Sequence, residues 1–74
     1  MKTTFTFVKA STTGLAKQAR SILNIVEAKG SISKSDLISQ IQLDVKSKQK
    51  AERLLSYYKG LLISNGHIKE TKHG

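Results

Sequence analysis

Cations gather in one short stretch of the sequence, KSKQKAERLLSY at residues 46–57, which holds four of them and one carboxylate. Four residues of this stretch recur at the spacing i, i+4, i+7 and i+11, which places them on one face of a helix: Lys46, Lys50, Arg53 and Tyr57. Lysine and arginine bind phosphate groups, and each such contact releases a counterion that the nucleic acid has condensed. The spacing therefore predicts a basic stripe that binds the backbone or the major groove of double-stranded DNA.

The place of these cations in their helix also indicates an outside partner. The unpaired N–H groups at a helix N-terminus carry partial positive charge, so each lysine there costs roughly 0.3–1 kcal/mol in the free protein. Phosphates nearby would make these lysines favourable. Further candidate nucleic-acid-binding residues are Lys48 on the same helix, Lys34 at the start of the preceding helix, and Lys69 on the last strand. Tyr57 either contacts a base, sugar or phosphate, or covers apolar surface.

The helix that carries the stripe is predicted at residues 47–64, where apolar residues recur at helical spacing. Asn65-Gly66 fits either a helix C-cap or a two-residue hairpin turn. We favour the C-cap, because the helical pattern continues directly up to it. Gly60 inside this helix costs about 1 kcal/mol relative to alanine, which indicates either the close approach of another backbone, such as an N-terminal strand, or a tolerated defect.

The helix before it is predicted at residues 34–42 and begins with a capping signal. Ser33 is the expected N-cap, and Asp36 lies in the first turn, where the helix dipole favours a negative charge. Residues 43–46 are expected to form the connector to the longer helix, with Asp44 as the cap of that helix. A short capped helix, a turn and a longer basic helix make the helix-turn-helix arrangement.

The remaining elements are one more helix and two strands. Alternating β-branched and aromatic residues predict a strand at Thr3–Lys9, and a second strand is expected at His67–Lys72. Ser11–Gly14 supplies turn and cap residues for a helix whose apolar residues recur from Leu15 up to Lys29, with Gly30 as its stop signal. The predicted fold is mainly α with a small β component: three helices closed by a two-stranded antiparallel sheet that pairs the first and last strands.

Length and charge narrow the class of protein. A chain of 74 residues has room for one domain, expected over residues 1–74, and a formal net charge of +8 favours a polyanionic partner. The sequence has no cysteine, no signal-peptide pattern and no apolar run long enough to span a membrane. We therefore expect a cytoplasmic protein with no membrane role. No apolar face is left over from the predicted core, so a monomer is the default.

Catalysis is not expected from this set of residues. The chain offers five scattered carboxylates and two histidines near its C-terminal end, with no nucleophile paired to a base and no glycine-rich phosphate loop. His67 and His73 lack the further ligands that a metal site needs. We expect neither an enzyme nor a cofactor or metal site.

Two segments carry a resemblance to a known family. GSISKSDL at residues 30–37, followed by a long helix and GLLISNGHIKE at residues 60–70, resembles a winged helix-turn-helix domain over nearly the whole chain. Val8-Lys9-Ala10-Ser11, at the end of the first strand, is similar to the N-terminal domain of the phage middle-promoter transcription activators. In that family the domain engages the sigma subunit of RNA polymerase, while a separate domain binds DNA. A full wing needs two strands after the third helix, whereas the residues after Gly66 provide one.

Two functions follow as expectations. The first is a small DNA-binding transcriptional regulator of phage or mobile-element type, which contacts DNA with its third helix. The second is a regulator that docks on an acidic surface of RNA polymerase, a sigma factor or another host machine, since opposite charge steers that encounter as well. Structured RNA is a weaker third partner, because the sequence offers no aromatic-rich sheet for base stacking.

Overall fold

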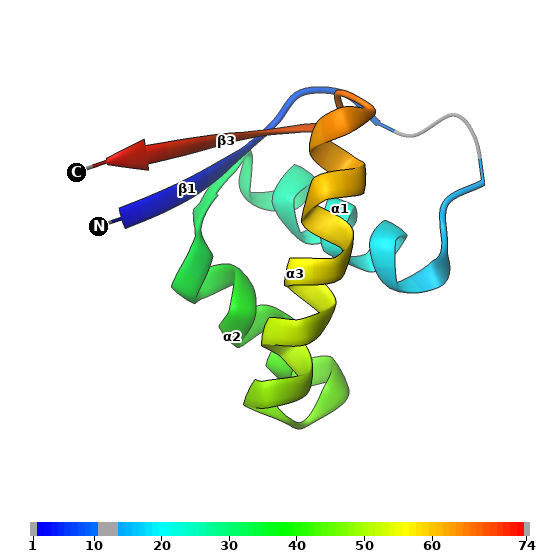
Figure 1. Cartoon of the computed structure of the whole chain (residues 1–74), viewed down its shortest axis with the longest axis vertical. Coiled ribbons are helices and arrows are strands. Elements are labelled where there is room, and N and C mark those ends of the chain that lie inside the picture. Colours follow the sequence, from blue (N-terminus) through cyan, green and yellow to red (C-terminus); the bar gives the residue numbers. More distant parts are fainter. Residues whose placement is uncertain (1, 11–13, 74) are drawn as a thin grey trace.

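The computed structural model describes residues 2–10 and 14–73, which form three helices and three strands. The elements in chain order are β1 (Lys2–Phe7), α1 (Lys17–Lys29), β2 (Ser31–Ser33), α2 (Lys34–Val45), α3 (Lys48–Ser64) and β3 (Ile68–His73). The long strands β1 and β3 lie side by side and extend from one end of the helices, with both chain ends at the strand tips (Figure 1). The predicted class, mainly α with a small β component, is confirmed.

The sheet is antiparallel, with β1 as the central strand between β2 and β3. Phe5 of β1 lies opposite Ile32 of β2 and opposite Glu70 of β3. The predicted pairing of the first and last strands is therefore confirmed, with β3 displaced by one residue from its predicted bounds. The sequence did not predict the third strand, because the three residues of β2 are too few to show a period of two.

The core lies between the three helices and one face of the sheet. Its largest fully buried side chains are Phe5, Ile22, Val26, Leu37, Leu55 and Leu62. On β1 the pleat turns Phe5 inward, while Thr4 and Thr6 on either side of it point to the opposite face. The sheet therefore contributes one buried face, and the helices close the core from that side.

Helix α1 ends as predicted but begins differently. Gly30 has a φ of 75° and donates its N–H to the carbonyl oxygens of Val26 and Glu27, so the predicted stop signal is confirmed. The N-cap residue is Ala16, which makes no side-chain capping bond, and the cap expected within Ser11–Gly14 is wrong. Residues 11–13 of that stretch lie outside the described residues.

The connection between α2 and α3 is shorter than predicted. Residues 43–45, expected in the connector, form the last turn of α2, which ends at Lys46 in the left-handed conformation (φ 61°, ψ 26°). The Lys46 N–H donates to the Gln42 carbonyl oxygen at 2.7 Å, which closes that turn. Ser47, rather than the expected Asp44, caps α3, and its Oγ accepts the N–H of Lys50 at 3.3 Å.

The C-terminal end of α3 is a helix cap that leads directly into β3. Gly66 has a φ of 78°, and its N–H donates to the Ile63 carbonyl oxygen, while the His67 N–H donates to that of Leu62. This pair of bonds is the Schellman arrangement, in which a glycine takes the left-handed position. The predicted C-cap at Asn65-Gly66 is thus confirmed.

Gly60 does not meet another backbone, so the expected crossing by the N-terminal strand is wrong. A Cβ added at Gly60 would find no heavy atom within 4 Å, and the residue is exposed on α3. We therefore expect Gly60→Ala to raise the free energy of unfolding by about 1 kcal/mol, because alanine loses less backbone entropy in a helix. Urea unfolding would measure this change. As a control, Gly66→Ala should lower the free energy of unfolding, since alanine is strained at the positive φ of Gly66.

Two serine caps determine where α2 and α3 begin. Ser33 Oγ accepts the Asp36 N–H at 3.3 Å, which confirms the predicted cap of α2. We expect Ser33→Ala to lower the free energy of unfolding by about 1 kcal/mol, and Ser47→Ala to have a similar effect, because each leaves an N–H without its acceptor. Chemical denaturation measures both losses. Ser21→Ala, at an exposed position inside α1, should cause no loss, and an equal loss there would contradict the capping explanation.

Across the described ranges 2–10 and 14–73, no helix has the length and apolar character that crossing a membrane requires.

Candidate nucleic-acid interface

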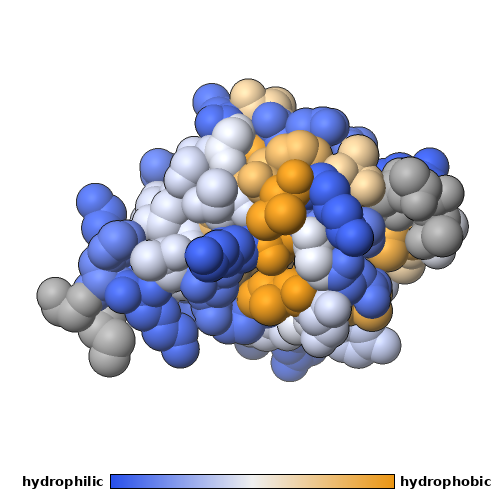
Figure 2. All heavy atoms as spheres, turned by 90° about the horizontal axis from the view of Figure 1, so that it is seen from above, coloured by the Kyte–Doolittle hydropathy of each residue, from blue (hydrophilic) through white to orange (hydrophobic). Residues whose placement is uncertain are grey.

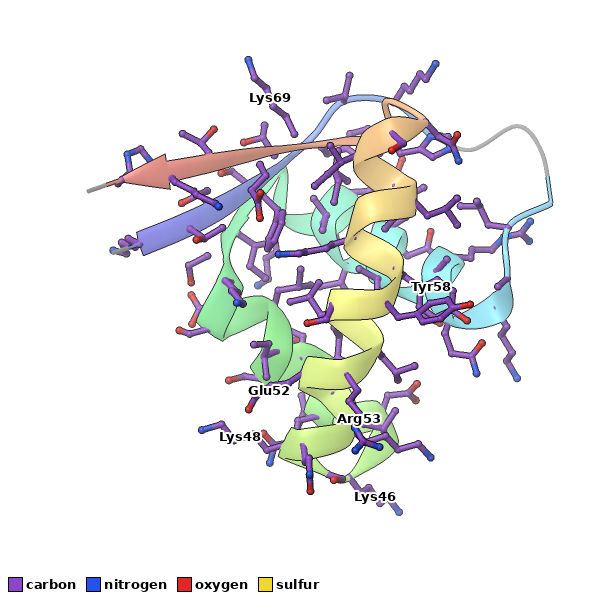
Figure 3. All side chains as sticks on the ribbon, in the orientation of Figure 1. Lys46, Lys48, Glu52, Arg53, Tyr58 and Lys69 are labelled. Atoms are coloured by element: carbon purple, nitrogen blue, oxygen red, sulfur yellow. The ribbon has the colours of Figure 1, made fainter. Side chains whose placement is uncertain are left out.

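The candidate interface is built from the N-terminal half of α3 and the turn that precedes it. The predicted stripe assumed one continuous helix from Lys46, whereas Lys46 is the left-handed residue that ends α2. Only Lys50, Arg53 and Tyr57 of the stripe share α3. The turn brings Lys46 to the same end of the molecule as Lys48, as Figure 3 shows. The four cations therefore belong to one end, although they do not form one helical line.

The cationic side chains of this end are exposed and lie away from the core. Lys46, Lys48, Lys50 and Arg53 are all exposed residues. Within the described part of the chain, the one salt bridge joins Lys59 Nζ and Glu70 Oε2 at 3.5 Å, and it involves none of these four. The nearest carboxylate in sequence on α3, Glu52, lies on the same side as Lys48, whereas Arg53 lies on the other side (Figure 3). The surface around the start of α3 therefore has more cationic than anionic side chains.

Tyr57 and Arg53 share a shallow hollow on the outer face of α3. The hollow is lined by Gln49, Glu52, Arg53, Ser56 and Tyr57. Tyr57 is 77% exposed, and its ring lies edge-on to that of Tyr58 with the ring centroids 4.7 Å apart. Tyr57 therefore does not cover the core, whereas Tyr58 is half-buried against it. The exposed phenol of Tyr57 can donate to an acceptor on a partner.

Gln49 and Ser56 are site residues that the sequence analysis missed. Both line the hollow with Arg53, and the spacing of the three is i, i+4 and i+7. The same periodicity that selected the cations would have found them, had uncharged polar residues been included. Glutamine pairs with adenine and arginine with guanine in the major groove, so Gln49 and Arg53 have the chemistry to read base edges.

Lys50 lies at the edge of a second hollow, on the side of α3 that faces α1. This groove has a volume of about 250 Å³. Its apolar lining comes from all three helices: Ile22 and Ile25 of α1, Ile41 and Val45 of α2, and Leu54 of α3. Its polar lining residues are Lys17, Gln18, Ser21, Asp44 and Lys50. Lys17 is a further cation that the sequence analysis did not select. Lys50 and Arg53 are neighbours on α3, at the spacing i, i+3, and each borders a different hollow.

The two remaining candidates lie away from this end. Lys34 is exposed in the first turn of α2 and lines a hollow with Lys2, Ser33 and Ser35. Lys69 is exposed on β3, at the opposite end of the molecule from Lys46 and Lys48 (Figure 3). Lys69 therefore does not belong to the same continuous surface as the start of α3.

The histidines and carboxylates do not gather into a metal-binding group in the residues that the structure describes. No three His, Asp or Glu side chains come together there in the way that a metal ion requires. His67 is buried, and its Nδ1 lies 3.3 Å from the carbonyl oxygen of Lys9, so it joins the residues after β1 to those before β3.

No protein-family model, curated protein or solved structure matches this chain. A function for this chain is therefore inferred from its charge distribution and the geometry of the candidate interface.

Proposed function

We propose that this chain is a small DNA-binding protein of the transcription-regulating type, which contacts a duplex with the N-terminal half of α3. The observation that carries the proposal is the group of exposed cations at that end, namely Lys46, Lys48, Lys50 and Arg53. Each is available to a phosphate, and each contact would release counterions from the DNA. The resemblance to winged helix-turn-helix domains supports DNA binding, whereas the resemblance to phage activators supports a role in transcription and a cytoplasmic location without specifying DNA as the direct partner.

The arrangement of α2 and α3 supports entry into a groove. In helix-turn-helix proteins the second helix lies in the major groove and its first residues contact the bases. Here Gln49 and Arg53 line the outer face of α3 and would read base edges, while Lys46 and Lys48 would bind the flanking phosphates. Lys46 adopts a left-handed conformation that favours glycine or asparagine, so a lysine there is retained at a conformational cost.

The experiment that tests the proposal is an NMR titration of the labelled protein with a random-sequence duplex of about two helical turns. Amide shifts would be followed at roughly 50 mM and 200 mM salt, because a contact with several phosphates weakens steeply over that range. We expect salt-sensitive shifts that cluster on residues 46–57. Absent shifts, or shifts of equal size over all exposed lysines, would contradict a specific surface on α3.

A second candidate function is docking on a protein partner, and the groove between the three helices favours it. The floor of the groove is apolar, and Lys17 and Lys50 provide positive charge around it. An apolar floor with a charged border is typical of a site that receives the side chains of a partner, and an acidic partner would be attracted to it. An acidic region of RNA polymerase or a sigma factor would satisfy this chemistry.

The same titration distinguishes the two candidates. DNA binding is expected to shift the amides of Gln49 and Arg53 on the outer hollow, whereas docking of an acidic helical peptide in the groove would shift those of Ile25, Val45 and Leu54. Shifts in the groove residues with the peptide, and none with the duplex, would replace the first proposal with the second.

A further inference from the structure

The outer face of the sheet carries a set of polar and basic side chains that has no part in either proposed function. Since Phe5 and Ile68 point into the core, the alternate residues of each strand point to the opposite side. The residues placed on that outer face are Lys2, Thr4 and Thr6 of β1, Ser31 and Ser33 of β2, and Lys69, Thr71 and His73 of β3. Every one of them is a lysine, a hydroxyl residue or a histidine, and there is no carboxylate among them.

The register of the strands arranges these groups in rows across the sheet. Thr4 lies opposite Ser33 on one side and Thr71 on the other, and Thr6 lies in the same way between Ser31 and Lys69. Ser33 Oγ accepts the Asp36 N–H in the α2 cap, and a hydroxyl that accepts one bond can still donate its own hydrogen, so the hydroxyls of these rows can all donate to a partner. Figure 2 views the molecule from above Figure 1. On the side from which the strands extend, the surface is mostly blue and white, and a strip of orange, hydrophobic residues lies beside it.

The one carboxylate in these strands lies on the inner side. Glu70 is opposite Phe5 and therefore shares the core-facing side of the sheet, where its Oε2 accepts from Lys59 Nζ at 3.5 Å. The glutamate is thus paired with a lysine of α3 and does not offset the charge of Lys2 and Lys69. The outer face keeps a net positive charge.

A flat surface of hydroxyls and lysines fits the phosphate backbone of a duplex. Serine, threonine and lysine side chains are common donors to phosphate oxygens, and such contacts carry no sequence information. Proteins that bind single strands on a sheet stack the bases on several aromatic side chains, whereas this outer face has no Phe, Tyr or Trp and only His73 at the end of β3. The chemistry therefore favours the backbone of double-stranded DNA.

The outer face and the α3 interface lie at opposite ends of the molecule. Figure 3 shows Lys69 above the sheet and Lys46 and Lys48 below the start of α3, and the molecule measures 29 × 29 × 20 Å. The outer face is directed away from the helices, so a straight duplex that lies along the start of α3 does not reach it.

We propose that the outer face of the sheet binds the backbone of a second duplex, so that one copy of this chain bridges two DNA segments. The inference rests on the proposed binding of DNA by α3, which supplies the first and stronger contact. With two lysines and His73 on the sheet, the second contact involves about two or three phosphates, so bridging is weaker than single-duplex binding and is lost first as salt rises.

A bridging assay tests this inference. One duplex is fixed to beads, a second fluorescent duplex is left in solution, and the protein is added at low salt; the retained fluorescence measures bridging. Single-duplex affinity is measured separately by fluorescence anisotropy. The test variant is Lys2→Gln with Lys69→Gln, which removes both lysines of the outer face. The control is Arg20→Gln with Lys29→Gln, which removes the same charge from exposed positions of α1.

We expect the sheet variant to lose bridging by about tenfold or more, while its single-duplex affinity stays within about threefold of wild type. The control variant should keep bridging. Sedimentation velocity of the proteins without DNA would check that the sheet variant retains the wild-type oligomeric state. Bridging that survives in the sheet variant would overturn the inference, because two copies joined elsewhere would then hold the two duplexes.

Two further outcomes separate this inference from the proposed function. A wild-type protein that binds one duplex but retains no second duplex overturns the bridging inference and leaves DNA binding by α3 in place. A wild-type protein that binds no duplex at all overturns the proposed function, and the bridging inference falls with it.

Discussion

Replacing both Lys50 and Arg53 with glutamate is expected to abolish the binding of duplex DNA. Both side chains are exposed on α3, so the fold should survive the change. Each substitution removes one cation that would contact a phosphate or a base and places a carboxylate in its position. The carboxylate repels the DNA, so the loss is larger than that caused by alanine.

The expected loss is at least about 100-fold in affinity at roughly 0.1 M salt, which corresponds to about 2.7 kcal/mol. The slope of log affinity against log salt should also become shallower, by about 0.9 if Arg53 contacts a base and only Lys50 contacts a phosphate, and by about 1.8 if both contact phosphates. Fluorescence anisotropy over a range of salt concentrations measures both quantities. Far-UV circular dichroism and a thermal unfolding curve would verify that α3 is intact.

The matched control for this variant is Arg20→Glu with Lys29→Glu. These exposed cations lie on α1, so the net charge changes by the same amount while the α3 surface is preserved. The control should lose far less affinity than the α3 variant. Equal losses in the two variants would mean that the overall charge of the protein attracts DNA and that α3 has no special part.

Truncation of Phe5 to alanine is expected to cause a large loss of stability. Phe5 is fully buried in the central strand, between β2 and β3, and packs in the core with the three helices. Phenylalanine-to-alanine changes in cores cost about 3–5 kcal/mol, because apolar contacts are lost and a cavity remains. A domain of this length has a total stability of about 4–11 kcal/mol, so this one substitution removes a large share of it.

Thermal unfolding followed by circular dichroism measures this loss, and the midpoint should fall by at least about 12 °C. Tyr57→Ala is the matched control, since it truncates an aromatic side chain of similar size that is 77% exposed. The free energy of unfolding of the control should change by no more than about 0.5 kcal/mol. Equal losses in the two variants would contradict the position of Phe5 at the centre of the core.

Local signals in the sequence predicted the elements well wherever a single side chain or backbone requirement decides the outcome. Ser33 begins α2 because its hydroxyl accepts a free N–H of the first turn, and Gly30 ends α1 because it takes a positive φ. The pairing of the two long strands was predictable as well, since both carry unpaired backbone groups. The amphipathic pattern of residues 47–64 predicted α3, on which Ala51, Leu55 and Leu62 are buried.

The sequence misplaced the features that depend on the end of α2. The helical pattern of α2 continues from Ile41 to Val45, which pack in and against the core, but Asp44 also fits the N-cap of a following helix, and the prediction based on that cap ends α2 too early. Consequently Lys46 was assigned to the face of α3, although it adopts a left-handed conformation in the turn. The predicted contact at Gly60 also depended on how β1 runs past the helices, which no local pattern specifies.

At the candidate site, composition and helical periodicity are enough to predict the charge and the helix that carries most of it. Periodicity along one helix is a local property, so Lys50, Arg53 and Tyr57 could be assigned to α3 without knowledge of the fold. By contrast, the packing of the elements against one another puts Lys50 beside a groove formed with α1, and Lys69 at the far end of the molecule. Those positions depend on how helices and strands distant in sequence pack together, because the burial of Phe5 and its neighbours sets the orientation of every element around the core.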